Sequence, residues 1–181
     1  SSGKDFRGPK KDISNKELEE GIKPSIIEGR YEKYILPKQE EEEARKITKF
    51  QNESEFITKI KNWIKEPETR PNKNETLALD SFSYTILRHM TLFKISEQNI
   101  IYRLFVEKDG TVKPLILIDQ EKLETIAEKT HKNYGHCNAE TSFQILSDYY
   151  TPGMRNILKE LVRTCPTCVS YNMKRTVKEK Q

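Results

Sequence analysis

Cysteine and histidine are both scarce in this sequence, with three residues of each among 181. Three cysteines cannot all pair, and two of them lie three positions apart in CPTC, which argues against a disulfide framework and favours a metal site or reduced thiols. Long apolar runs are lacking too, since no stretch reaches the roughly 18 apolar residues of a membrane span. The polar N-terminal segment also lacks the apolar core of a secretion signal. We therefore expect a soluble, intracellular protein without a membrane partner.

Apolar residues are few overall, because hydrophobic types make up only 34% of the chain. Such a chain supports one modest domain or two small ones. A large excess of one charge is also missing, since the formal net charge is +4, and any case for a polyanionic partner must rest on local clusters. The polar, proline-interrupted N-terminal segment predicts a flexible charged arm over residues 1–45. The segment over residues 40–50, which overlaps the end of this arm, forms either a helix or a solvated charge run.

Helical spacing of apolar residues marks the next part of the chain. It predicts a helix over residues 52–66, with Asn52 as its N-cap, and a second helix over about 75–92. His89 falls inside the second helix, and a lone helical histidine is interpreted here as structural. Neither helix carries a group to which we assign chemistry.

After this helix, the spacing of apolar residues changes from that of a helix to that of a strand. Two runs rich in β-branched and aromatic residues flank the Asp109-Gly110 pair, which predicts a β-hairpin over about 99–118. No other segment is a good strand candidate. The helices and the hairpin together predict an α+β domain over residues 46–118.

Three further helices are predicted downstream. Asp119 is expected to cap a helix from Glu121 to Thr130, which places His131 at its end. Apolar side chains at helical spacing predict helices in AETSFQILSDYY, residues 139–150, and in MRNILKELV, residues 154–162. Three helices this short bury too little surface to be stable without an additional cross-link.

The rare histidines and cysteines supply that cross-link. They follow the pattern His131-x4-His136, then 28 residues, then Cys165-x2-Cys168. Two imidazoles and two thiolates suit one tetrahedral, structural Zn²⁺ ion better than they suit magnesium or calcium, which prefer oxygen. Cys137 is an alternative fourth ligand in place of His136, and the histidine is favoured.

The same segment carries further features beside these ligands. Gly135 precedes the second histidine, YYTPGM precedes the last helix, and Arg-Thr-Cys-x-x-Cys ends it. In these features the segment from His131 to about Tyr171 resembles the HHCC zinc-binding domain of retroviral and gypsy-type retrotransposon integrases, whose gypsy members usually read YYWPGM. Thr151 therefore stands where tryptophan is common. The upstream stretches IIYRLFVEKDG and LILIDQEKLETIAEKTH resemble the hairpin and lead-in helix of an N-terminal extension domain in spumaviral and gypsy-like integrases.

The resemblance completes a prediction of the fold. The fold class is mainly α with a small β-hairpin. The extension-like domain over residues 46–118 is followed by a zinc-stabilised three-helix HHCC domain over 119–173 and a basic linker or tail over 174–181. The family's catalytic aspartates and glutamate have no counterpart after Lys174, so this chain alone is not expected to catalyse DNA strand transfer.

The resemblance also implies partners, because the family domain contacts viral DNA ends and other integrase subunits and promotes multimerisation. We therefore expect DNA binding, self-association or assembly with integrase subunits, and a nuclear location. Three basic residues at positions i, i+4 and i+8 of the last helix form a stripe on the side opposite its apolar face. Two more basic residues follow the last cysteine, and such a cluster can neutralise phosphates. The predicted DNA-contacting residues are Arg155, Lys159, Arg163, Lys174 and Arg175. The other interpretation of the stripe is a solvated helix face, which the adjacent Glu160 keeps open.

A second class of function remains open at this stage. The zinc fold could serve as a protein-interaction scaffold in a domesticated, integrase-derived host protein, with the charged arm binding a host partner. A Cys2His2 zinc finger fits poorly, because the ligand order is reversed and the gap between the pairs is longer than about twelve residues.

Overall fold

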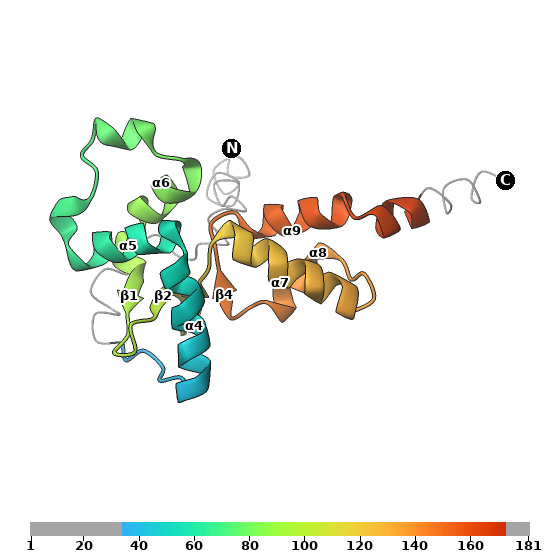
Figure 1. The fold of residues 1–181 in the computed structure, drawn as a ribbon, viewed down its shortest axis with the longest axis horizontal. Helices are drawn as coiled ribbons and strands as arrows, with labels where there is room; N and C mark the ends of the chain where they lie inside the picture. The colour runs from blue at the N-terminus through green and yellow to red at the C-terminus, as the bar shows by residue number, and fades with distance from the viewer. Residues whose placement is uncertain (1–33, 173–181) are drawn as a thin grey trace, which may run out of the picture. The chain divides into compact units, whose positions relative to one another are not determined.

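The computed structural model describes residues 34–172 as two compact units that divide after Leu117. Residues 1–33 and 173–181 lie outside the described residues, and with them most of the predicted arm and both Lys174 and Arg175. Helices predominate, and strands form only a small part of the chain (Figure 1). The predicted class, mainly α with a small β component, is confirmed.

Two consecutive helices open the first unit. α4 spans Glu41–Glu53 and α5 spans Glu55–Lys65, so the last residues of the range assigned to the arm are helical. The predicted N-cap at Asn52 is wrong, because Asn52 lies in the last turn of α4. Ser54, between the helices, has an extended backbone, and its hydroxyl accepts a hydrogen bond of 3.2 Å from the Ile57 N–H. Such a bond satisfies one of the orphan donors at a helix start and fixes where α5 begins.

The single helix predicted over 75–92 is wrong, because three shorter elements replace it. A first 3-10 turn, before this range, spans Pro67–Thr69. Within the range, a second 3-10 turn spans Glu75–Ala78, the helix α6 spans Ser81–Arg88, and a third 3-10 turn spans Met90–Leu92. Asp80 causes the break, because its backbone is extended and its carboxylate accepts from the Ser83 N–H at 2.8 Å. His89 caps the far end of α6, with Nδ1 lying 2.8 Å from the Thr85 carbonyl oxygen.

Three antiparallel strands follow in the order β1, β2, β3, with the bounds Phe93–Ile95, Ile101–Val106 and Val112–Leu117. The predicted hairpin is confirmed as β2 and β3, in register with Tyr102 opposite Ile116. Its turn contains Gly110 at φ +89°, a backbone angle that glycine adopts without steric cost. β1 contradicts the expectation that no other strand exists, and it pairs with β2 along its whole length.

A buried glutamine joins α4 to the sheet. Gln51 is fully buried, and its side-chain amide donates to the carbonyl oxygens of Ile101 at 3.1 Å and Leu117 at 2.9 Å. Its Oε1 atom accepts from the Ile101 N–H at 3.0 Å. The apolar core of the unit includes Ile47, Ile57, Ile60, Trp63, Ile86, Leu92, Phe93 and Leu104.

The second unit contains α7 (Gln120–Asn133), α8 (Ala139–Ile145), the two-residue strand β4 (Tyr149–Tyr150) and α9 (Met154–Arg163). Asp119 caps α7 as predicted, since its Oδ1 accepts from the Lys122 N–H at 2.8 Å. The helix expected to reach residue 150 ends at Ile145 instead. The Tyr150 carbonyl accepts from the Ile118 N–H at 2.9 Å, and this extended pairing is incompatible with a helix there.

The three helices of this unit pack around one core, and α9 contacts both α7 and α8 (Figure 1). It is small, as the sequence led us to expect. Its buried apolar side chains are Ile118, Leu123, Ala127, Leu146, Tyr150, Met154 and Leu158. Thr151, in the place where gypsy relatives have tryptophan, is 2% exposed. None of the helices among residues 34–172 has the length and apolarity to cross a bilayer.

Candidate metal centre

The first predicted ligand, His131, lies in the last turn of α7 and is buried. Its Nδ1 atom is 2.8 Å from the carbonyl oxygen of Cys137. A ring N–H that donates to a backbone carbonyl fixes the tautomer and leaves the other nitrogen, Nε2, with a lone pair directed away. His131 is therefore oriented as a metal ligand through Nε2.

The second ligand, His136, follows the turn that ends α7. Gly135 and His136 both have left-handed backbones, with φ of +66° and +58°. The His136 N–H donates to the His131 carbonyl at 2.6 Å, and the Gly135 N–H donates to the Lys132 carbonyl at 3.3 Å. These two bonds form a Schellman motif, the common glycine-containing end of an α-helix. The motif sets the five-residue spacing, because it bonds the backbones of the two histidines directly.

The two cysteines lie at the junction of α9 with a following helical segment over 166–172. Cys165 closes α9, since its N–H donates to the Val162 carbonyl at 3.2 Å, and its own carbonyl accepts from the Val169 N–H in the next segment. The backbone N–H of Cys168 hydrogen bonds to the Cys165 sulfur and lowers the pKa of that thiol to about 6. Cys-x2-Cys thus forms a local turn that favours a thiolate at Cys165.

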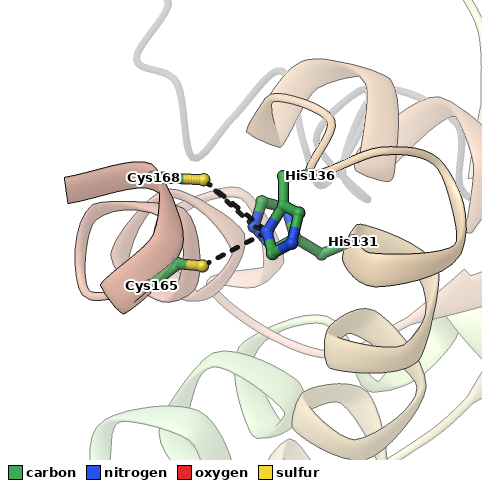
Figure 2. A group of neighbouring side chains, drawn as sticks. All are labelled: His131, His136, Cys165 and Cys168. Carbon is green, nitrogen blue, oxygen red and sulfur yellow. Dashed lines mark hydrogen bonds between the residues drawn. The ribbon is translucent and has the colours of Figure 1, made fainter. Parts of the chain in front are cut away.

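The four side chains converge on one point (Figure 2). Their ligand atoms all lie within 4.8 Å of one another. His136 Nδ1 is 3.1 Å from His131 Nε2 and 3.4 Å from Cys165 Sγ, and Cys168 Sγ is 3.3 Å from His131 Nε2. Ligands bound tetrahedrally to zinc at about 2.0–2.3 Å stand roughly 3.3–3.8 Å apart. The site therefore fits one structural zinc ion, as the sequence predicts.

The electrostatics of the cysteine pair also suit a cation. Burial and the neighbouring Cys165 sulfur raise the pKa of Cys168, so the two thiols do not ionise together at neutral pH without a counter-charge. A bound zinc ion supplies that charge, and its binding releases the remaining thiol proton. With two imidazoles and two thiolates the coordination is complete, which leaves no open position for a substrate.

Cys137 contributes differently from the alternative considered above. Its sulfur lies 3.3 Å from the Ser142 hydroxyl, and His136, not Cys137, belongs to the group of four converging atoms. Its backbone carbonyl is what orients His131. Sequence reasoning missed this contribution, because a carbonyl that supports a ligand leaves no signal in residue type or spacing.

The basic stripe on α9 is only partly available for a partner. Arg155 Nη1 lies 2.6 Å from Glu140 Oε2, and its guanidinium is 4.0 Å from the centre of the Phe143 ring. Arg163 forms an ion pair with Glu160, its neighbour on the same helix. Lys159 is exposed and has no ion-pair partner among residues 34–172. The predicted contacts at Lys174 and Arg175 lie outside the described residues.

These features define a class. A tetrad of two histidines and two cysteines that joins one helix end to another, around a small helical core, is typical of zinc-stabilised helical domains. Within that class, residues 118–174 match the family model of the integrase zinc-binding domain. The four converging ligands of the second unit fit the HHCC site of that domain, which is a non-catalytic part of integrases.

The match begins at residue 118 and does not include the first unit, so the resemblance of that unit to an integrase extension domain remains a prediction. No curated protein and no solved structure matches the chain.

Proposed function

We propose that the zinc unit contacts DNA and promotes assembly within an integrase-related protein. The observation that carries this proposal is the HHCC centre in a segment that matches the integrase zinc-binding family. The closed ligand shell assigns the metal a structural task, because four protein ligands leave no site for a reacting group. The function then depends on the surface that the zinc-fastened helices present.

The exposed face of α9 is the surface best suited to phosphates. Lys159 has no ion-pair partner in the described part of the chain, so a phosphate would not have to displace one. Arg163 shares an exposed pair with Glu160, and exposed pairs contribute little to stability, so a phosphate can compete for the arginine. Arg155 is held by Glu140 and by the Phe143 ring, and we assign it a positioning role between α8 and α9.

A charge-reversal experiment tests this ranking. The zinc-loaded full chain is titrated with labelled duplex DNA across a range of salt concentrations, and binding is followed by fluorescence anisotropy. Lys159→Glu is expected to weaken binding and to reduce the salt slope by about one unit, because each phosphate contact contributes about 0.9 to it. Arg155→Ala is expected to lower the stability of the unit while leaving that slope nearly unchanged.

Lys108→Glu is the matched control, because it makes the same change of charge at an exposed position in the β2–β3 turn of the first unit. Equal losses from the Lys159 and Lys108 reversals would show that only net charge matters and would contradict the assigned surface.

Assembly is tested separately, by sedimentation of the chain with and without zinc. We also propose a nuclear location, because a eukaryotic cell keeps its chromosomal DNA in the nucleus.

A protein-interaction scaffold in a domesticated host protein is the second candidate. It is favoured by the charge of residues 118–172, where acidic side chains slightly outnumber basic ones. A pocket of about 480 Å³ beside the zinc turn, lined in part by Val162 and the exposed Tyr171, also suits a protein partner. Absence of DNA binding together with zinc-dependent capture of a protein would favour this candidate.

A further inference from the structure

The pocket beside the zinc turn has walls from two parts of the chain. The connection between α7 and α8 forms one wall, and α9 with the helical segment over 166–172 forms the other. Each wall contains a zinc ligand, and His136 and Cys168 point toward each other from the two sides (Figure 2). Binding of zinc therefore joins the two walls. The lining residues that are not metal ligands include Gly135, Asn138, Val162, Thr167 and Tyr171.

This lining combines an aromatic ring with unused polar groups. The Tyr171 side chain is 63% exposed. Asn138 Oδ1 accepts from the Thr141 N–H at 2.8 Å, whereas the side-chain nitrogen of Asn138 has no hydrogen-bond partner among residues 34–172. The Thr167 hydroxyl likewise has no partner in this part of the chain. A ligand that suits such a lining has a flat apolar face with hydrogen-bonding groups around it, as a nucleobase has.

The charges that suit DNA lie next to the pocket and not inside it. No lysine, arginine, aspartate or glutamate from the described residues lines it, so its ligand group is uncharged. Val162 follows Lys159 by three positions on α9, and side chains so spaced are neighbours on a helix, with Cβ atoms roughly 5–6 Å apart. A nucleotide joins its phosphate to its base through one sugar. A strand with a phosphate at Lys159 therefore has a base within reach of the pocket.

Other occupants match the lining less well. A paired base uses its edge in the base pair and its faces in the stack, so an unpaired base enters at the least cost. An apolar side chain of a protein partner fills the same space. It would leave the Asn138 amide and the Thr167 hydroxyl without partners once water is excluded, which is unfavourable.

We propose that this pocket receives the base of an unpaired nucleotide, stacked on Tyr171, while Lys159 contacts an adjacent phosphate. The inference rests on the DNA binding proposed above and extends it, because it gives the zinc unit a preference for DNA with unpaired bases. Stacking on an aromatic ring accepts every base, so the preference is for DNA structure and not for sequence.

The test compares two fluorescein-labelled DNAs with the zinc-loaded full chain, followed by anisotropy. Both contain the same duplex and a single-stranded overhang of the same length. The overhang of the first consists of thymidines, and that of the second consists of abasic nucleotides, so the phosphates are equal in number and only the bases differ. The first is expected to bind about tenfold more tightly, because one stacked base contributes at least about that much.

Four variants locate the base. Tyr171→Ala is expected to reduce the affinity ratio of the two DNAs to less than about twofold, while Tyr171→Phe retains the ring and should retain the ratio. Tyr134→Ala is the matched control, because Tyr134 is 60% exposed in the same unit but does not line the pocket. It should leave the ratio unchanged. Lys159→Glu should weaken the binding of both DNAs and preserve the ratio, because both carry the phosphate. Zinc content and circular dichroism check that each variant is folded.

The outcomes separate this inference from the function on which it rests. Equal binding of the two DNAs by the unaltered chain would overturn the base pocket and leave DNA binding intact. A ratio that survives Tyr171→Ala, or that falls equally in Tyr134→Ala, would place the base elsewhere and would also overturn it. Binding of neither DNA would contradict both proposals and would assign the pocket to the protein partner considered above.

Discussion

Replacing Gly135 with alanine isolates the contribution of the left-handed turn between the two histidine ligands. Gly135 has φ +66°, and no heavy atom lies within 4 Å of the place where a Cβ would stand. The substitution therefore adds no clash, and its cost is the intrinsic preference of an L-residue against the left-handed region, about 1–2 kcal/mol. The same turn bonds His136 to His131, so the cost falls on the arrangement that binds zinc.

That cost corresponds to a loss of about fivefold to thirtyfold in zinc affinity. We expect to measure it by competition of the full chain against a chromophoric zinc chelator under reducing conditions. Gly135→Asn should lose less, because asparagine adopts the left-handed region more readily than alanine. Gly110→Ala is the matched control, since Gly110 has φ +89° and equally open surroundings but lies in the first unit. Unchanged zinc affinity in Gly135→Ala, or an equal loss in Gly110→Ala, would refute the reasoning.

Two further predictions concern stability. Removing zinc with a chelator, or replacing Cys165 with serine, should unfold the unit that follows Leu117. In a hydrogen-exchange measurement, β2 and β3 should remain protected. A fully folded metal-free chain would contradict the structural role of zinc. Gln51→Ala leaves three buried backbone groups without their partner, and it should lower the free energy of unfolding of the first unit by roughly 3 kcal/mol in denaturant titrations. The control Gln120→Ala loses only an exposed hydrogen bond to Glu124 and should leave that free energy nearly unchanged.

The zinc ligands could be predicted from sequence because their signal is local and chemically rare. His131 and His136 belong to one helix end, and Cys165 and Cys168 to one turn, so spacing alone describes each pair. The cap at Asp119 and the Asp109-Gly110 hairpin were predictable for the same reason, since each depends on a few adjacent residues.

The errors in the first unit come from competition between signals that sequence alone does not rank. Asn52 and Ser54 are both good caps two positions apart, and the continuation of α4 to Glu53 decides between them. Apolar spacing runs through residues 75–92 without interruption, yet Asp80 breaks the segment by capping a new helix. β1 is only three residues long, which is too short for an alternating pattern to be recognised.

The basic stripe on α9 shows a different limit of sequence reasoning. Helical spacing correctly places Arg155, Lys159 and Arg163 on one helix. It does not show that Glu140 and Phe143, from α8, pack against the first of them. Availability of a charge for a partner is a tertiary property, because a neighbouring helix can neutralise the charge.

The Schellman motif at the end of α7 has a further consequence for the order in which the zinc unit assembles. Each ligand pair is built by hydrogen bonds within a few residues, so both halves of the site can form before the chain between them is ordered. Zinc then closes a loop of 28 residues between His136 and Cys165. By the chain-entropy estimate used for disulfides, closing a loop of about this length removes roughly 3.5 kcal/mol of conformational freedom from the unfolded state. The metal acts here as a reversible cross-link between two turns that lie far apart in the sequence.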